Sequence, residues 1–282
     1  MATRHADPLT APESTRVPVG HAAAEPRRPR VVALILAYDV AGLLERALRK
    51  IPRQLVDDIF VMDDCSTDGT SDVARRLGLT VYRNEKNLGY GGNLRAGLQR
   101  AVRDHAADYV VEIHGDGAQF NPAAIAAALP LMRENVPFIM GSRFVEPGRA
   151  RESGMPLVRF LANRGLSRLS RRVLGLPLTE YHSGFRVYAR ELVEALPLDA
   201  NADNHLFSFQ ILAQAAYFGI EVREVPVDAD YLSEHTSISL WDATIYAFNN
   251  FVCLGQYLLA RADLHHSRQF PNRRETAASS TS

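Results

Sequence analysis

The sequence predicts an α/β protein with a mostly parallel, Rossmann-like sheet flanked by helices, in a single large domain. Two observations carry this prediction. Apolar, β-branched runs alternate with amphipathic helical patterns along the first half of the chain, which is typical of βαβ units. Some of those runs are apolar at consecutive positions, as strands are when helices cover both faces of a sheet. The chain has 282 residues, enough for one large core.

The first half of the chain predicts five strands with helices between them. Short apolar runs predict the strands, over residues 31–36, 59–62, 79–82, 109–113 and 138–140. Apolar residues at helical spacing predict the helices, over 41–51, up to about Leu77, up to about His105, and over 123–134. For the last of these helices we expect Asn121 as the N-cap and Pro122 at the first helical position.

The second half is less regular. We expect a helix over 157–173, a strand over 185–188, a helix over 206–218 and a strand over 221–227. The uncharged run from Ala243 to Ala260 approaches the length of a membrane span, but Asn249, Asn250 and Gln256 interrupt it. A core helix or an oligomer-interface helix is therefore favoured over a helix that lies on a membrane surface, and a true span is not expected.

These patterns divide the chain into four parts. Residues 1–30 are rich in Pro, Ala and Arg and lack the apolar core of a secretory signal, so we expect a disordered tail there. The domain itself is expected over 31–240 and is followed by a C-terminal helix over 241–262. We expect residues 263–282 to form a second disordered tail.

Composition argues against several classes of function. Lysine plus arginine balance aspartate plus glutamate, 32 against 32, so no overall field attracts nucleic acid, and we expect no nucleic-acid partner. The two cysteines, Cys65 and Cys253, are far apart and lack metal-ligand spacing. This argues against a disulfide framework or a structural zinc site and fits a location in the reducing cytoplasm.

The stretch 110–122 is the centre of the functional prediction. Its strand breaks at Gly115 and Gly117, with Asp116 between them at the carboxyl end of a buried strand, where α/β sheets place their ligands. The glycines allow the backbone to approach a bulky anion, and Asp116 offers oxygen atoms to a hard divalent cation. Taken alone, the same residues fit an ordinary strand-to-helix turn with a capping aspartate equally well.

Two further polar segments follow neighbouring strands. In the run 63–70, Asp63 and Asp64 could accept hydrogen bonds from a nucleobase or a ribose, or could cap the following helix. The glycine-rich run 87–93 lacks the spacing and the lysine of a P-loop and is not a dinucleotide-binding fingerprint, which argues against an ATPase or a dehydrogenase.

Taken in order, these segments resemble family 2 glycosyltransferases of the GT-A fold, nearest the polyprenyl-phosphate and dolichyl-phosphate sugar synthases. The resemblance extends from Val31 to Leu240 and divides this region into a nucleotide-sugar half, 31–140, and an acceptor half, 141–240. The motifs that carry it are Ala37-Tyr38-Asp39, the runs 63–70, 87–93 and 114–117, Gly141-Ser142-Arg143-Phe144, Gly154-Met155-Pro156, Asn163-Arg164, His182-Ser183-Gly184-Phe185-Arg186, Val225-Pro226-Val227, and Glu234 with Ser237-Ile238.

The resemblance implies a site for a nucleotide-sugar donor and for a divalent cation, Mg²⁺ or Mn²⁺. The residues it places around the donor are Ala37, Tyr38, Asp39, Asp63, Asp64, Gly91, Asn93, His114, Gly115 and Asp116. The cation would be held by Asp116, His114, Gln119 and His235. It also implies that Arg143 and Arg186 lie near the donor and acceptor phosphates.

The chain departs from the family pattern at several acids. Only the second acid of the family's Asp-x-Asp motif is present, as Asp116, with His114 in the first place. Asp39-Val40 replaces an Asn-Glu pair, and Glu180 replaces an aspartate. The segment 201–208 lacks two carboxylates, and Asp230 stands where the family has a basic residue. These changes leave the metal site and the identity of the donor open.

The chemistry that the family implies is one inverting displacement at the anomeric carbon. A polyprenyl-phosphate acceptor is already anionic and needs no general base, whereas an acceptor hydroxyl needs one. Asp203 or Glu180 is then the candidate base, although each could instead be a capping or salt-bridge residue. The alternatives to a lipid-phosphate acceptor are a transferase that acts on a soluble small molecule and a nucleotide-sugar-binding protein without turnover.

One charged segment bears on whether the protein also contacts a membrane. Residues 143–174 contain eight arginines, which form either a solvated helix face or a surface that meets anionic lipid. The second interpretation implies peripheral contact with the inner face of the membrane. Homo-oligomer formation also stays open.

Overall fold

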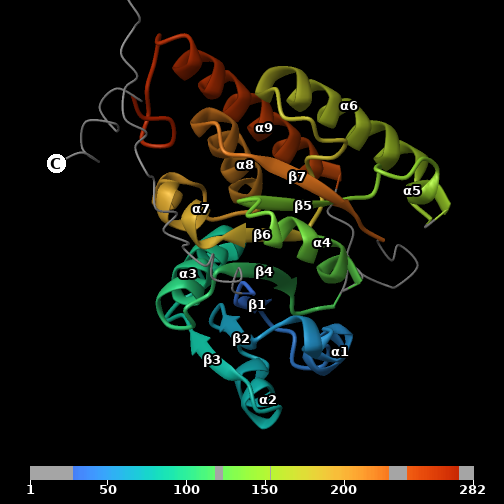
Figure 1. Ribbon diagram of the computed structural model, residues 1–282, viewed down its shortest axis with the longest axis vertical. Coiled ribbons are helices and arrows are strands. Elements are labelled where there is room, and N and C mark those ends of the chain that lie inside the picture. Colours follow the sequence, from blue (N-terminus) through green and yellow to red (C-terminus); the bar gives the residue numbers. More distant parts are fainter. Residues whose placement is uncertain (1–27, 118–122, 153, 229–239, 273–282) are drawn as a thin grey trace, which may run out of the picture.

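The computed structural model describes residues 28–117, 123–152, 154–228 and 240–272. In these residues seven strands form one mixed sheet in the order β3-β2-β1-β4-β6-β5-β7 (Figure 1). The strands are β1 Val31–Ala37, β2 Asp58–Asp63, β3 Thr80–Arg83, β4 Tyr109–His114, β5 Phe138–Ser142, β6 Arg186–Ala189 and β7 Val222–Pro226. The prediction of an α/β fold with strands at these places is confirmed.

The sheet is parallel except around β6, which runs antiparallel to both of its neighbours, β4 and β5. The parallel strands β1, β2 and β4 end in step, with Ala37 opposite Asp63 and Leu36 opposite His114. The three segments that follow these strands therefore begin at the same edge of the sheet. We call this edge, formed by the loops after β1, β2 and β4, the donor edge.

Two layers of helices cover the sheet. Helices α1, α2 and α4 enclose one core, while α3, α7, α8 and α9 enclose the other. Strand β1 is buried throughout because Val32 and Leu34 alternate with Ala33 and Ile35 between these two cores. The helices are α1 Leu44–Lys50, α2 Thr70–Arg76, α3 Gly89–Arg103, α4 Ala123–Arg133, α5 Arg149–Glu152, α6 Leu157–Leu174, α7 Arg190–Ala195, α8 Leu206–Phe218 and α9 Leu240–Arg261.

The C-terminal segment corrects one prediction. Residues 263–272 were expected in a disordered tail, but Phe270 is fully buried against Tyr217 and Tyr257. Gln269 donates from Nε2 to Oδ1 of Asn201 at 2.7 Å. Because one aromatic side chain can anchor a segment that has no periodic pattern, this burial could not be predicted from the sequence. Residues 1–27 and 273–282 lie outside the described residues, as do Asn121 and Pro122.

Helix α9 is long, but none of the helices in the described ranges is both long and apolar enough to cross a bilayer.

Candidate functional site

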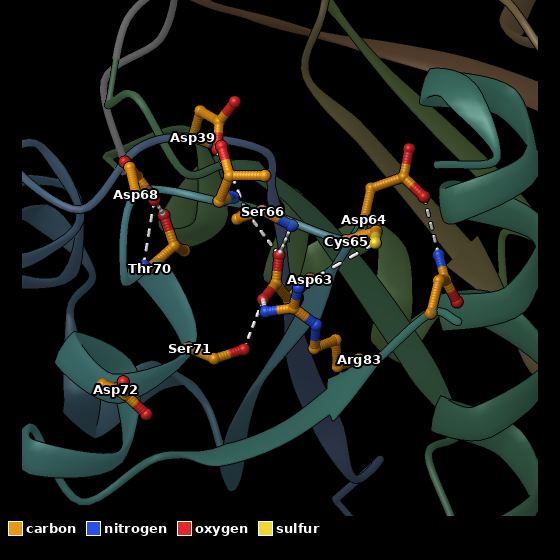
Figure 2. Close-up of polar contacts among 12 residues, drawn as sticks. Asp39, Asp63, Asp64, Cys65, Ser66, Asp68, Thr70, Ser71, Asp72 and Arg83 are labelled. Atoms are coloured by element: carbon orange, nitrogen blue, oxygen red, sulfur yellow. Dashed lines mark hydrogen bonds and ion pairs between the residues drawn. The ribbon is translucent and has the colours of Figure 1, made fainter. Parts of the chain in front are cut away.

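The loop after β1 is held in place by the loop after β2 (Figure 2). Oδ1 of Asp39 accepts a hydrogen bond from the N–H of Thr67 at 2.7 Å, and the N–H of Asp39 donates to Oγ of Ser66 at 3.0 Å. The N–H of Ala41 donates to Oδ2 of Asp68 at 2.8 Å. Burial opposes the charge on Asp68, but hydrogen bonds from Thr70 and Ala41 lower the pKa of its carboxyl. These contacts fix the backbone at the donor edge without a ligand.

Asp63 lies inside this loop. Its side chain is fully buried, and its oxygens accept hydrogen bonds from the N–H and Oγ of Ser66 and from Oγ of Ser71. The guanidinium of Arg83 lies 3.6 Å from Oδ2. These contacts give Asp63 a role in shaping the loop, and the direct nucleotide contact that the resemblance implies stays a prediction.

Asp64 is held from one side only. Its Oδ1 accepts hydrogen bonds from Nδ2 of Asn84 and from the N–H of Leu88, both at 2.8 Å. Asn84 in turn donates to Oδ1 of Asn93, whose Nδ2 donates to the carbonyl of Met62. Both hydrogen bonds reach Oδ1, and Oδ2 of Asp64 accepts none from another described residue. Asn93, predicted at the donor, thus acts by orienting Asp64.

Tyr38 and Ala37 complete the edge at the end of β1. Ala37 is buried opposite Asp63, whereas the ring of Tyr38 is 52% exposed and lies beside the Asp39 loop. An exposed aromatic ring next to an oriented carboxylate is suited to a flat heterocycle such as a nucleobase. Of the residues predicted to bind the nucleotide, Tyr38 and Asp39 are exposed, whereas Asp64 is only 3% exposed and keeps one oxygen, Oδ2, without a hydrogen bond from another described residue.

Gly91 serves a contact within the protein. Its N–H donates to the backbone carbonyl of Asp203 at 2.8 Å, and a Cβ at this position would collide with the carbonyl of Ala202. The carboxylate of Asp203 is bound by Arg95 at 2.7 Å. Asp203 thus covers the start of α3 with its backbone and forms an ion pair with its side chain.

Glu180 and Arg143 form a buried ion pair. Glu180 is fully buried and accepts hydrogen bonds from the N–H of Arg143 at 2.7 Å and from its Nε at 2.8 Å. The guanidinium Nη2 of Arg143 also contacts Oε1 of Glu180. For both predicted bases, Glu180 and Asp203, the salt-bridge interpretation is the one that the geometry supports.

Asp116 lies in a tight turn after β4. The N–H of Gly115 donates to the carbonyl of Leu36 at 2.8 Å, and Gly117, with a φ of 62°, donates to the carbonyl of His114 at 3.0 Å. The half-buried Asp116 is therefore carried by a fixed backbone between β1 and β4. A single carboxylate combined with substrate phosphate oxygens is a usual way of binding Mg²⁺, so this position fits a cation.

The other predicted metal ligands do not join Asp116 in the described residues. Nε2 of His114 lies 3.3 Å from Oε1 of Glu112, so this nitrogen faces the core. Gln119 and His235 lie outside the described residues. No group of three or more His, Cys, Asp or Glu side chains that could hold a metal occurs in the part of the chain that the structure describes.

A buried polar cluster, which the sequence analysis missed, lies beneath the donor edge on the α3 and α8 side. At its centre is Glu112, a fully buried carboxylate of β4 that accepts hydrogen bonds from the hydroxyls of Tyr188, at 2.7 Å, and Tyr90. Burial opposes its charge, but His114 and Arg186 hold the pKa of Glu112 below its usual value. The same contact with Glu112 raises the pKa of His114 against the effect of burial. A glutamate inside an apolar strand was the signal available in the sequence.

Arg186 and His182 occupy the same cluster with unsatisfied nitrogens. Arg186 is 3% exposed, and its Nε has no hydrogen-bond partner among the described residues. Nε2 of His182 is likewise buried without a partner, while its Nδ1 lies 3.2 Å from the hydroxyl of Tyr246. Burial and the charges of Arg186 and Arg143 lower the pKa of His182 to about 3. A buried cation with a free donor suits an anionic ligand.

The comparisons with known proteins agree with this geometry. The family model described as glycosyl transferase family 2 matches residues 33–196, more than half of the chain. Over 219 residues the chain is 24% identical to the UDP-N-acetylglucosamine–dolichyl-phosphate N-acetylglucosaminyltransferase of Methanococcus voltae, covering 71% of this chain and 86% of that protein. Over 205 residues it is 28% identical to the undecaprenyl-phosphate mannosyltransferase of Micrococcus luteus, covering 70% and 82%.

A solved structure agrees in fold. Glucosyl-3-phosphoglycerate synthase from Mycobacterium tuberculosis, in complex with Mn²⁺, uridine-diphosphate-glucose and phosphoglyceric acid, matches with a TM-score of 0.59 at 21% identity. The match covers 85% of this chain and 81% of that chain, and it confirms the predicted GT-A fold. With its sheet, its donor edge and a family match over more than half of its length, the chain belongs to glycosyl transferase family 2.

Proposed function

We propose that this chain is an inverting glycosyltransferase that moves a sugar from a nucleotide-sugar donor to a polyprenyl phosphate. The observation that carries the proposal is Arg186, a buried guanidinium whose Nε lacks a partner among the described residues, beside the unpaired Nε2 of His182. A buried guanidinium N–H without an acceptor is costly unless a ligand satisfies it, and a phosphate does so with a charge-assisted hydrogen bond. The names of the two relatives add support, because both include a polyprenyl or dolichyl phosphate.

The donor site of this proposal is the donor edge. Tyr38 stacks on the nucleobase, and Oδ2 of Asp64 accepts hydrogen bonds from the nucleoside. Asp116 would hold a divalent cation beside the donor diphosphate. When bound, Mg²⁺ or Mn²⁺ supplies positive charge that stabilises the departing diphosphate. The Mn²⁺ in the complex of the mycobacterial enzyme supports the choice of a divalent cation. His114, Gln119 and His235 stay as further candidates for its coordination.

The reaction needs no general base. An anionic oxygen of the acceptor phosphate attacks the anomeric carbon, the bond from that carbon to the donor diphosphate breaks, and the nucleoside diphosphate leaves from the opposite side. The structure supports this choice because Glu180 and Asp203, the two candidate bases, are both engaged in ion pairs with Arg143 and Arg95. A hydroxyl acceptor would need one of these carboxylates to be released first.

A phosphate on a soluble acceptor is the second candidate, because Arg186 recognises the phosphate and not the lipid. The mycobacterial enzyme of the same fold, crystallised with phosphoglyceric acid, gives this alternative a concrete form. The lipid and the soluble acceptor would be bound by the same phosphate-binding residues. Their products differ, because a glycosylated lipid partitions into an organic phase and a glycosylated soluble acceptor stays in water. A cytoplasmic location belongs to the proposal in both cases.

The test is transfer of radiolabelled sugar from a panel of nucleotide sugars, with Mn²⁺, to a polyprenyl phosphate in detergent or to phosphoglyceric acid. Label in the organic phase supports the lipid acceptor, and label in the aqueous product supports the soluble one. We expect Arg186→Gln to raise the acceptor KM about tenfold or more, since one charge-assisted contact is lost, with the donor KM nearly unchanged. The matched control is Arg103→Gln, which removes an exposed arginine of α3.

Two results would contradict the proposal. Equal acceptor KM values for the parent and the Arg186→Gln protein would remove Arg186 from the acceptor site. Binding of a nucleotide sugar, seen as a raised melting temperature, without transfer to any acceptor would favour a binding protein without turnover.

A further inference from the structure

Two neighbouring helices expose most of the large apolar side chains on the surface. Among the described residues, ten of the thirteen large hydrophobic side chains that are exposed lie on α6 and α9. They are Leu157, Val158, Leu161 and Leu169 on α6, and Ile245, Phe248, Phe251, Val252, Leu258 and Leu259 on α9. Figure 1 shows the two helices side by side on the outer side of the molecule, beyond α8. We call these ten side chains the α6/α9 face.

Helix α9 presents a continuous apolar stripe to the outside. Ile245, Phe248, Val252 and Leu259 follow helical spacing along one side, and the ring of Phe248 is 63% exposed. The opposite side, which includes Tyr257, is buried. No charged residue stands between Thr244 and Ala260. The helix has 22 residues and is therefore about 33 Å long, so these exposed side chains form an extended apolar stripe, in contrast to the single scattered apolar residues of an ordinary surface.

Helix α6 adds positive charge around a smaller apolar centre. Val158, 75% exposed, shares the outer side of the helix with Leu161 and Leu169. Arg168 and Arg172 lie on the same side about two and three turns after Leu161. Both are exposed, and neither forms an ion pair with another described residue. The helix contains no aspartate or glutamate. An apolar stripe with arginines beside it is typical of a helix that lies in a lipid headgroup layer.

Charge decides between the two partners that an apolar face could have. A second copy of the chain, docked by the same face, would bring Arg168 and Arg172 toward another set of arginines. No acid on α6, or on the outer side of α9 between Thr244 and Ala260, would neutralise them. Anionic headgroups supply the missing charge, and the acyl layer beneath them supplies an apolar surface.

We propose that the α6/α9 face docks the protein on the surface of a bilayer that contains anionic lipid, with both helices lying in the headgroup layer. The exposed aromatic and aliphatic side chains of α9 enter the boundary of the acyl layer, and the arginines of α6 bind headgroup phosphates. Helix α9 lies on the surface and does not cross it.

Helix α9 also joins this face to the buried cation. Ile245 is exposed on the face, while the next residue, Tyr246, points inward and its hydroxyl lies 3.2 Å from Nδ1 of His182, beside Arg186. The same helix thus contributes side chains both to the proposed docking face and to the surroundings of Arg186, where the acceptor phosphate is proposed to bind. This last step rests on the proposed function, whereas the docking itself does not.

Sedimentation with vesicles that contain neither donor nor acceptor tests the docking. We expect the protein to bind vesicles of phosphatidylcholine with phosphatidylglycerol, to bind phosphatidylcholine alone much more weakly, and to dissociate from the mixed vesicles as salt is raised. Phe248→Gln with Phe251→Gln should weaken binding at least about tenfold. Arg168→Gln with Arg172→Gln should weaken it about fivefold for each arginine removed.

The matched control removes two exposed arginines at the opposite end of the sheet, Arg46→Gln on α1 and Arg76→Gln on α2, and should bind as the parent does. All the substituted side chains are exposed, so equal melting temperatures are expected throughout. Vesicle binding that is absent, or that the α6 and α9 variants leave unchanged, would overturn the proposal. A parent dimer that the Phe248→Gln, Phe251→Gln variant converts to a monomer, without an effect on vesicles, would assign the face to a second copy. The vesicles contain no substrate, so the two experiments are independent. A negative vesicle result would count against membrane docking alone, and a negative transfer assay would count against the proposed function alone.

Discussion

The donor edge and the buried polar cluster around Glu112 and Arg186 lie on neighbouring strands of one sheet, but their polar groups differ in how far they are hydrogen-bonded. At the donor edge, Asp39, Asp63 and Asp68 all receive hydrogen bonds from the adjoining loops. In the buried polar cluster, Arg186 and His182 each have a buried nitrogen without a hydrogen-bond partner among the described residues. The donor edge is therefore held in place by contacts within the protein, whereas the cluster around Arg186 keeps buried nitrogens that the proposed acceptor phosphate would satisfy.

The largest effect is expected where the two regions meet, at Asp116. Asp116→Asn should lower kcat on the order of a thousandfold, because the amide cannot replace the carboxylate as a ligand that charges and orients the cation. The melting temperature of the ligand-free protein should stay nearly the same, since the side chain lies in a loop. Transfer rates with Mn²⁺ and thermal melts of the same samples measure both. A kcat close to that of the parent would exclude Asp116 from the reaction.

The next effect separates two adjacent carboxylates of the donor edge. Asp63→Asn should lower the free energy of unfolding by about 1–3 kcal/mol, because a buried acceptor that binds Ser66 and Ser71 is altered. Asp64→Asn keeps Oδ1 and should leave stability nearly unchanged while weakening binding of nucleoside diphosphate by about 1–3 kcal/mol. Urea unfolding and calorimetric titration give the two numbers. If both variants lost only ligand affinity, Asp63 would belong to the binding surface after all.

The last effect concerns His182 in the buried cluster and depends on pH. The pKa of His182 is about 3 in the folded protein, against 6.5 for an ordinary histidine. Between these values the unfolded chain binds more protons, so stability should fall as the pH falls below about 6.5, by up to about 1.4 kcal/mol per pH unit. His182→Gln removes this contribution and should give a shallower loss of stability in acid. Parallel unfolding curves of the two proteins between pH 6.5 and 4 would contradict the pKa shift.

The strands of the sheet could be predicted well because buried parallel strands consist of short runs of apolar residues. The sequence also predicted that polar residues would gather at the donor edge, since the carboxyl ends of parallel strands meet there. It did not predict the antiparallel insertion of β6 between β4 and β5, because no local pattern encodes the direction of a four-residue strand. Phe270 was missed for a similar reason, as one buried ring leaves no periodicity.

The individual roles at the site were harder to predict than its position. Asp63 and Asp64 are neighbours in the chain, and only the structure shows that the first faces the loop and the second is held from one side. The pair of Glu180 with Arg143 joins residues 37 positions apart, and the cluster around Glu112 is drawn from α3, β4, β6 and α8. Such contacts depend on tertiary packing, which a single sequence does not display.

The burial of Phe270 connects the C-terminal segment, through a few hydrogen bonds, to the start of α3 near the donor edge. Gln269 binds Asn201, and two residues later the carbonyl of Asp203 receives the N–H of Gly91 at the start of α3. A protein cut after residue 262 would therefore lose more than a tail: it would open a cavity beside Tyr217 and release the segment that closes α3 next to Asn93. The C-terminal segment therefore holds the 201–203 segment against α3, and the folded domain extends to residue 272 or beyond.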